Sequence, residues 1–206
     1  MNTTATIRSS AAAGTFRIRT LTMTAMLSAI SYLLAFVELP VPLSPSFAKF
    51  DFSDFPALIG AFAFSPFCGV MIELVKNVLQ LFGTSTAGIG ELANFLMGSV
   101  YVFSAGAIYR LHKTKQAARI ACIVSSVLMG IAAAVVNYFV LLPMFEQFMP
   151  LDQVIASFGA FIPFIQTKLD VALYNAFPFN LLKGLAIGLV AMPTYKRLTP
   201  FLKGRN

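Results

Sequence analysis

Charged residues are scarce in this chain of 206 residues, making up 11% of it, whereas hydrophobic residues make up 58%. A soluble globular domain has about 25% charged residues, which cover its outer faces. Here, apolar stretches of about twenty residues follow one another with short polar joins. The composition excludes a soluble fold, leaves no room for a separate soluble domain, and predicts one all-α integral membrane domain over residues 1–206.

Motifs for several kinds of chemistry are also missing. No stretch matches the phosphate-binding loop G-x-x-x-x-G-K-[ST], so that route to ATP hydrolysis is excluded. The single histidine, His112, lies in a basic cluster, and there is neither an H-E-x-x-H zinc helix nor a G-x-S-x-G nucleophile turn. Cys68 and Cys122 lie in apolar runs without metal-ligand or redox spacing, and we interpret them as small packing residues. We therefore predict no enzyme, no metal and no cofactor.

The net charge of +7 does not indicate nucleic-acid binding, because the basic residues stand at the ends of apolar runs rather than on a hydrophilic surface. The positive-inside rule predicts that such clusters are cytoplasmic. Eleven of the fifteen Lys and Arg residues fall in three clusters: Arg8, Arg17 and Arg19; Arg110, Lys113, Lys115 and Arg119; Lys196, Arg197, Lys203 and Arg205.

The hydropathy pattern predicts six transmembrane helices. Prolines break the apolar runs after the first and fifth helices, and Pro193 is expected to end the last one. The first run follows basic residues as in a signal peptide, but it is long and lacks a small-residue cleavage site, so we expect it to remain as helix one. The predicted spans are about 20–39, 54–64, 67–82, 91–111, 119–142 and 170–193, after a cytoplasmic segment 1–19.

Six spans place both termini in the cytoplasm together with all three basic clusters. The join between the fifth and sixth spans is expected to carry a short interfacial helix. Among the acids, Asp51 and Asp54 are expected at an outer helix end, and only Glu73 is expected inside a span.

Polar residues within a span are costly unless they are paired or face a cavity. Glu73 and Lys76 lie at i and i+3 on one helix face with Asn77, and an ion pair between them would explain both without a ligand. The alternative is an intramembrane enzyme that uses Glu73 and Lys76 on a lipid or cofactor.

Three asparagines and a lysine are further candidates. Asn94 and Asn137 are explained either by hydrogen bonds between helices or by contact with a ligand, and the aromatic residues after Asn137 suit a planar heterocycle. Asn180 and Lys183 lie one turn apart on the same face. Lys183 needs either an acid partner, for which Glu73 is the candidate, or a cavity with a polar ligand, which we favour.

Two other segments have open interpretations. The loop around residues 46–55 alternates aromatic and polar residues. This pattern is compatible with a lid over a site or with an aromatic anchor at the membrane interface. Ala25 and Ala29 form a small-residue face that allows close approach of a helix, either within this bundle or in another subunit.

Five stretches together point to a known family: KFDFSDFP at 49–56, VKNVL at 75–79, GELANFLMG at 90–98, NYFVLLP at 137–143 and FPFNLLKG at 177–184. Along nearly its full length the chain resembles the riboflavin-specific S component of energy-coupling-factor (ECF) transporters. The resemblance implies a six-helix protein of the bacterial plasma membrane that takes up flavin from outside. It also implies association with a transmembrane coupling subunit and two cytoplasmic ATPases.

The resemblance also assigns residues. It implies that Asn137, Asn180 and Lys183 hold the isoalloxazine ring, whose pyrimidine edge alternates carbonyl acceptors with an N–H donor. It further implies substrate contacts for Asn94 and for Glu91, which either touches the ribityl chain or caps its helix. The lid matches Phe47, Ala48 and Lys49, and the face that meets the coupling subunit matches Ala25 and Ala29.

These residues predict high-affinity binding and uptake of riboflavin. An S component for another vitamin, or for phosphorylated flavins such as FMN, is the alternative. The sequence motifs at 90–98 and 177–184 argue against thiamine and biotin.

Overall fold

The computed structural model describes residues 3–40, 49–84, 86–148 and 150–204. The described chain is helical apart from one short antiparallel pair, β1 (Leu39–Pro40) and β2 (Lys49–Phe50), in which Leu39 lies opposite Phe50. The expected all-α architecture is therefore confirmed except for this pair, which joins the two ends of the loop after the first helix.

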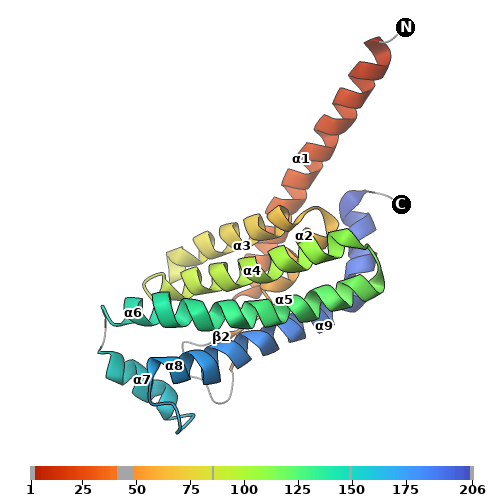
Figure 1. Ribbon diagram of the computed structural model, residues 1–206. Helices are drawn as coiled ribbons and strands as arrows, with labels where there is room; N and C mark the ends of the chain where they lie inside the picture. Colours follow the sequence, from red (N-terminus) through yellow and green to blue (C-terminus); the bar gives the residue numbers. More distant parts are fainter. Residues whose placement is uncertain (1–2, 41–48, 85, 149, 205–206) are drawn as a thin grey trace.

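Long helices form a bundle in which α4 packs on α3 and α5, and α5 packs on α9 (Figure 1). The amino-terminal part of α1 extends beyond the bundle, close to the end of α9 (Figure 1). The helices of the bundle are α1 (Thr3–Leu34), α2 (Asp54–Ala63), α3 (Pro66–Gln80), α4 (Ile89–Leu111), α5 (Lys115–Val136) and α9 (Phe177–Lys203). The shorter elements are η1 (Leu81–Gly83, a 3₁₀ turn), η2 (Asn137–Leu141, a π-helix), α6 (Leu142–Phe145), α7 (Leu151–Gly159), α8 (Lys168–Asp170) and η3 (Val171–Ala176, a π-helix).

Four helical stretches of the described chain are long and apolar enough to cross a membrane: Pro66–Gly83, Ile89–Leu111, Lys115–Phe145 and Lys168–Lys203. Two shorter apolar helices, Ile18–Leu34 and Asp54–Ala63, coincide with the remaining predicted spans. At 1.5 Å per residue the ten residues of α2 cover only about 15 Å, roughly half of a hydrocarbon core. Each predicted span is thus a helix, while six crossings stay a prediction.

Helix boundaries differ from the prediction most in α1 and α9. Helix α1 runs from Thr3 to Leu34 rather than over 20–39, and α9 continues through Pro193 and Pro200 to Lys203 rather than ending at 193. A proline inside a helix removes one backbone hydrogen bond and crowds the carbonyl four residues earlier, which membrane helices tolerate more often than soluble ones. At the end of α9, Nε and Nη2 of Arg19 donate to the carbonyl oxygens of Leu202 and Phe201 at 2.8 and 3.0 Å, and so pair carbonyls of the last turn. The helix expected in the join before the last span is present as α7.

Small residues bring α5 and α9 into close contact. A Cβ on Gly184 would lie 2.7 Å from Ser126 Oγ, and one on Gly188 would lie 2.9 Å from Cys122 Cβ. Only glycine fits this approach. Cys122 is buried and carries a free thiol, which agrees with its expected packing role. The opposite face of α5 is apolar and exposed, as a lipid-facing surface requires: Ile120, Ile123, Val124, Val127, Leu128, Ile131 and Val135.

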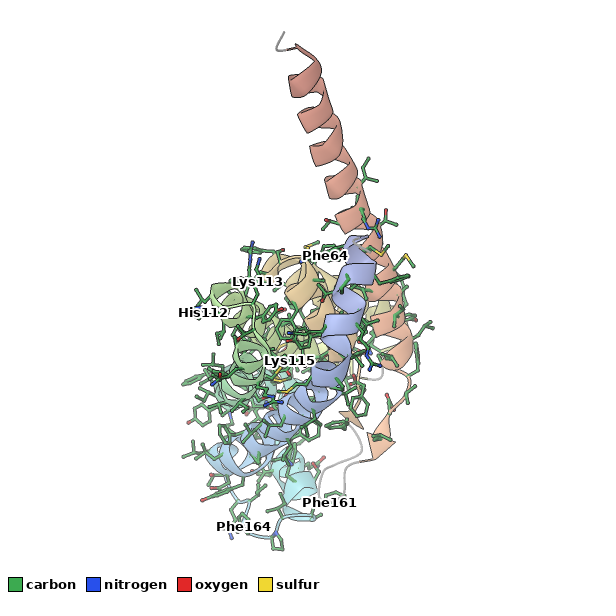
Figure 2. The ribbon with its side chains drawn as sticks, turned by 90° about the vertical axis from the view of Figure 1, so that its right-hand side faces the viewer. Phe64, His112, Lys113, Lys115, Phe161 and Phe164 are labelled. Carbon is green, nitrogen blue, oxygen red and sulfur yellow. The ribbon has the colours of Figure 1, made fainter. Side chains whose placement is uncertain are left out.

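The two ends of the bundle differ in character. Figure 2 shows His112 and Lys113 at the same end as Phe64, and Phe161 and Phe164 at the other end. We call the first the basic end. There the aromatic cluster of Phe62, Tyr109 and Tyr195 joins α2, α4 and α9, with ring centroids 4.6 to 5.6 Å apart.

Candidate functional site

A cavity of about 280 Å³ opens toward the end opposite the basic end. This volume is close to the lower end of the range for small-molecule sites, roughly 300–1,000 Å³. Its walls come from the carboxyl end of α1, the first turns of α4, both π-helices, the first turns of α9 and α7. Aromatic side chains supply much of the lining, and polar groups stand among them: Tyr32, Phe36, Phe145, Phe158 and Phe179, with Gln80, Asn94, Asn137, Asn175, Asn180 and Lys183.

The fold brings together most of the predicted site residues. Glu91, Asn94, Asn137, Asn180 and Lys183 all line this cavity, although they come from three separate parts of the chain.

The other predicted residues lie elsewhere. Phe47 and Ala48 lie outside the described residues, and for Lys49 the structure describes only its place in β2. Ala25 and Ala29 are exposed on α1, away from the cavity, so packing inside this bundle does not explain them.

The two π-helices place Asn137 and Asn180 in the cavity wall. Each π-helix ends just before a proline, Pro143 or Pro178, whose ring would collide with the carbonyl four residues earlier in a regular α-helix. The wider turn moves that carbonyl away: Leu142 N donates to the carbonyl of Asn137, five residues earlier. The apolar motifs with a proline thus create the local widening that lines the site.

The two amides are oriented by their own helices. Asn137 Nδ2 donates to the carbonyl of Ala133 at 2.8 Å, and Asn180 Nδ2 donates to that of Ala176 at 2.9 Å. Each bond leaves the amide Oδ1 as an acceptor for another donor. The bond between helices that the sequence left as an alternative is therefore not what the Asn137 nitrogen makes, whereas Asn94 of α4 does accept one from Lys183 of α9.

Lys183 is 2% exposed and has both a cavity and acid partners. Its Nζ lies 3.1 Å from Asn94 Oδ1 and 3.3 Å from the nearest carboxylate oxygen of Asp51 and of Asp54. Asp54 begins α2, so its expected place at a helix end is confirmed, although Asp51 and Asp54 are 6% and 0% exposed. The segment before α2 folds inward: Asp51 Oδ1 accepts from Ser53 N at 2.7 Å, and the Ser53 carbonyl accepts from Ser31 Oγ of α1.

The predicted ion pair between Glu73 and Lys76 is confirmed, with Lys76 Nζ 2.6 Å from Glu73 Oε2. Lys76 Nζ is also 2.6 Å from Asp54 Oδ1 and donates to Ser53 Oγ at 3.0 Å. Neither Glu73 nor Lys76 is among the residues that line the cavity. Their burial is thus explained by mutual compensation, as burial of charge requires, and the hypothesis of an enzyme built on them loses its site.

Glu91 organises the loop before α4. Its Oε2 accepts from the hydroxyls of Thr84 and Thr86 at 2.9 and 3.1 Å, and Thr86 Oγ1 accepts from Gly90 N at 3.0 Å. Gly88 precedes α4 with a φ of 88°, which favours glycine. The carboxylate of Glu91 thus holds the threonine hydroxyls of the loop, one of which accepts from a backbone N–H of α4, and its contact with a ribityl chain stays a prediction.

Sequence reasoning missed several lining residues. Phe179 stands inside the FPF motif, and its ring lies 6.5 Å from that of Phe50 next to the β1–β2 pair, so the motif itself could have indicated it. Phe158 comes from α7, which was expected only as an interfacial helix. Asp51 also lines the cavity, although it was expected only at a helix end.

The described residues contain no group of three or more His, Cys, Asp or Glu side chains that could hold a metal ion. The buried acids are instead compensated by lysines, and the arrangement can bind a ligand by hydrogen bonds and aromatic packing.

Comparison with known proteins gives a consistent result. The family described as ECF transporter, substrate-specific component, matches residues 19–195. The chain is 34% identical to riboflavin transporter RibU of Staphylococcus aureus (strain TCH60), covering 86% of this chain and 89% of that protein. It is 27% identical to riboflavin transporter FmnP of Bacillus subtilis (strain 168), over 91% and 95% of the two chains. A solved structure of the S component of a bacterial ECF transporter superposes with a TM-score of 0.73 at 32% identity, covering 91% of this chain and 99% of that one.

Proposed function

The chain belongs to the substrate-specific components of ECF transporters, and from this premise we propose that it captures riboflavin and serves as the substrate-binding subunit of an ATP-driven vitamin transporter of the bacterial cell membrane. The observation that carries the proposal is the cavity in which Asn94, Asn137, Asn180 and Lys183 meet among aromatic side chains. Relatives named as riboflavin transporters support it.

The polar groups suit the flavin ring. Lys183 can only donate, while the free Oδ1 atoms of Asn137 and Asn180 can accept, so together they match an edge that alternates carbonyls with an N–H. Glu91 is placed to accept from a ribityl hydroxyl. Phe47, Ala48 and Lys49 are proposed as the lid, since the β1–β2 pair anchors that loop beside Phe179 at the cavity.

The proposed topology has six crossings with both termini in the cytoplasm, within one membrane domain. The described members of the three basic clusters support it because they lie on or next to α1, α4, α5 and α9 toward one end of the bundle. Tyr109 at the end of α4 contacts Tyr195 near the end of α9, and Arg19 of α1 reaches the last turn of α9. The positive-inside rule makes this end cytoplasmic, so the cavity opens toward the outside.

The energy source is proposed to lie in partner subunits, because the sequence has no phosphate-binding loop. Ala25 and Ala29 are exposed on α1, where a small-residue face lets a transmembrane coupling subunit approach closely. Two cytoplasmic ATPases would complete the complex. No covalent chemistry is assigned to this chain.

Phosphorylated flavins and other vitamins are the alternatives. The described cavity wall carries three carboxylates, Glu38, Asp51 and Glu91, against one ammonium, Lys183. This balance favours an uncharged flavin over FMN, whose phosphate adds negative charge.

The proposal is tested with detergent-purified protein from riboflavin-fed cells. A flavin absorption band is expected, and after the ligand is stripped, titration should quench riboflavin fluorescence with one-to-one saturation. Competition with FMN, thiamine and biotin ranks the alternatives. Colourless protein that shows no quenching would refute the proposal. If another vitamin competes more strongly, that vitamin would replace riboflavin as the proposed substrate.

A further inference from the structure

Five buried charged residues form one continuous chain from the cavity into the bundle. We call Asp51, Asp54, Glu73, Lys76 and Lys183 the buried charge cluster. Their side chains are at most 8% exposed, and they come from the segment before α2 and from α2, α3 and α9. Such groups are costly in a membrane interior, so their arrangement calls for a reason.

Asp54 is the bridge of this cluster. Its Oδ1 lies 2.6 Å from Lys76 Nζ, and its Oδ2 lies 3.3 Å from Lys183 Nζ. Asp54 is 0% exposed and is not among the residues that line the cavity, whereas Lys183 and Asp51 are. Among the ion-pair partners of Asp54 in the described chain, Lys183 is the one that reaches the cavity.

Lys76 fixes the bridge in turn. Its ammonium contacts Glu73 and Asp54, both at 2.6 Å, and the Ser53 hydroxyl at 3.0 Å. Because Lys76 occupies Oδ1, the carboxylate of Asp54 presents its other oxygen toward α9. On the far side of Lys183, Asn94 Oδ1 accepts at 3.1 Å. The Lys183 ammonium thus lies between Asp54 behind it and two acceptors in the cavity wall, Asn94 and Asp51.

We propose that Asp54 is a positioning residue of the flavin site, which holds the Lys183 ammonium at the cavity wall while Lys76 fixes the orientation of the Asp54 carboxylate. This inference rests on the proposed riboflavin binding. A flexible lysine side chain loses rotamer freedom when it binds a ligand, and a site that holds it beforehand avoids that cost. Asp54 would therefore set riboflavin affinity without touching the ligand.

The competing explanation is that Asp54 only holds α2, α3 and α9 together. Asp54→Asn tests the proposal first, and we expect riboflavin affinity to fall on the order of tenfold or more, as for partners of buried hydrogen-bonded charges. Glu146→Gln is the matched control, since it removes the acid of an exposed ion pair with Lys168 at 3.3 Å, and its affinity should be unchanged.

A charge-compensated variant separates positioning from stability. Asp54→Asn with Glu73→Gln and Lys76→Met removes the Lys76 ammonium together with the two carboxylates that contact it at 2.6 Å and leaves Asp51 opposite Lys183, which should restore the apo melting temperature toward wild type. If Asp54 positions Lys183, affinity stays low in this stable protein. If affinity recovers together with the melting temperature, the role is structural and the inference is overturned.

A double-mutant cycle with Lys183→Met closes the test. Because Asp54 acts through Lys183, Asp54→Asn should cost little additional affinity once Lys183 is gone, whereas independent effects would add. If the wild-type protein binds riboflavin but the losses of affinity in the two single variants add up in the double variant, this inference is refuted and the proposed function is not. A wild-type protein that binds no riboflavin would refute the proposed function, and the inference with it.

Discussion

The same helices are built differently at their two ends. At the basic end, α2, α4 and α9 meet through the aromatic cluster of Phe62, Tyr109 and Tyr195, and α5 and α9 approach through Gly188 and Cys122. At the other end, π-helices widen α5 and α9 around a cavity with polar walls.

The two ends of the bundle therefore contribute differently to the stability of the fold. Small residues and rings give dense packing at the basic end, where the chain has no ligand to hold. At the cavity end, the chain keeps buried charges and a wider backbone turn, both of which are less favourable than apolar packing. Substitutions at the basic end should therefore change stability, and substitutions around the cavity should change affinity.

The largest expected effect is at Lys183. Lys183→Met leaves Asp51 and Asp54 without this ammonium and removes a donor from the cavity, so riboflavin affinity should fall about 100-fold, within the range of roughly 2–5 kcal/mol for truncating a buried hydrogen-bonded charge. Fluorescence quenching measures it. Lys196→Met on the exposed surface of the basic end is the control and should bind normally. Unchanged affinity in a folded Lys183→Met protein would remove Lys183 from the site.

Gly188→Ala tests the basic end. The added Cβ would lie 2.9 Å from Cys122 Cβ, which belongs to a rigid part of α5, so the free energy of unfolding should fall by about 1–3 kcal/mol. Thermal unfolding followed by circular dichroism should show a lower midpoint, and riboflavin affinity should stay within about twofold of wild type. For Gly83→Ala, where nothing lies within 4 Å of the added Cβ, the packing penalty should be absent. Equal midpoints for the two variants would contradict the close approach of α5 and α9.

Asn180→Ala tests the opposite pattern at the cavity. Losing the Oδ1 acceptor should weaken riboflavin binding about tenfold, which corresponds to about 1.4 kcal/mol, while the unfolding midpoint changes little. Asn137→Ala should behave alike. The exposed amide of Gln153 on α7 supplies the matched control, Gln153→Ala, with wild-type affinity. A drop in stability without a drop in affinity would mean that Asn180 belongs to the packing.

The smallest effect is expected at the exposed pair of Glu146 and Lys168, whose side chains are 51% and 31% exposed. Glu146→Gln should change the free energy of unfolding by less than about 1 kcal/mol, because water and salt already screen the pair. Chemical denaturation at low and high salt measures this. A larger change would show that the join between α6 and α8 matters more to the fold than its exposure suggests.

Several features were predictable because they depend on local chemistry. Apolar stretches of the right length gave each helix, and the spacing of Glu73 and Lys76 gave their ion pair. The motifs around Asn137 and Asn180 indicated residues that the structure places in one cavity. The end of α9 was missed because Pro193 is only a local signal, whereas the last turn is bonded by Arg19 from a helix far away in the sequence.

By itself, the sequence determined the membrane environment and the helical class, since composition and hydropathy act on each segment independently. It also determined which polar residues would be costly in a span. Only the tertiary structure decided which partners compensate these polar residues. Lys183 is compensated by Asp51 and Asp54, more than a hundred residues away in the chain, because folding the segment before α2 inward brings them together. Partnership between buried charges depends on distance in space, which no local pattern of residues encodes.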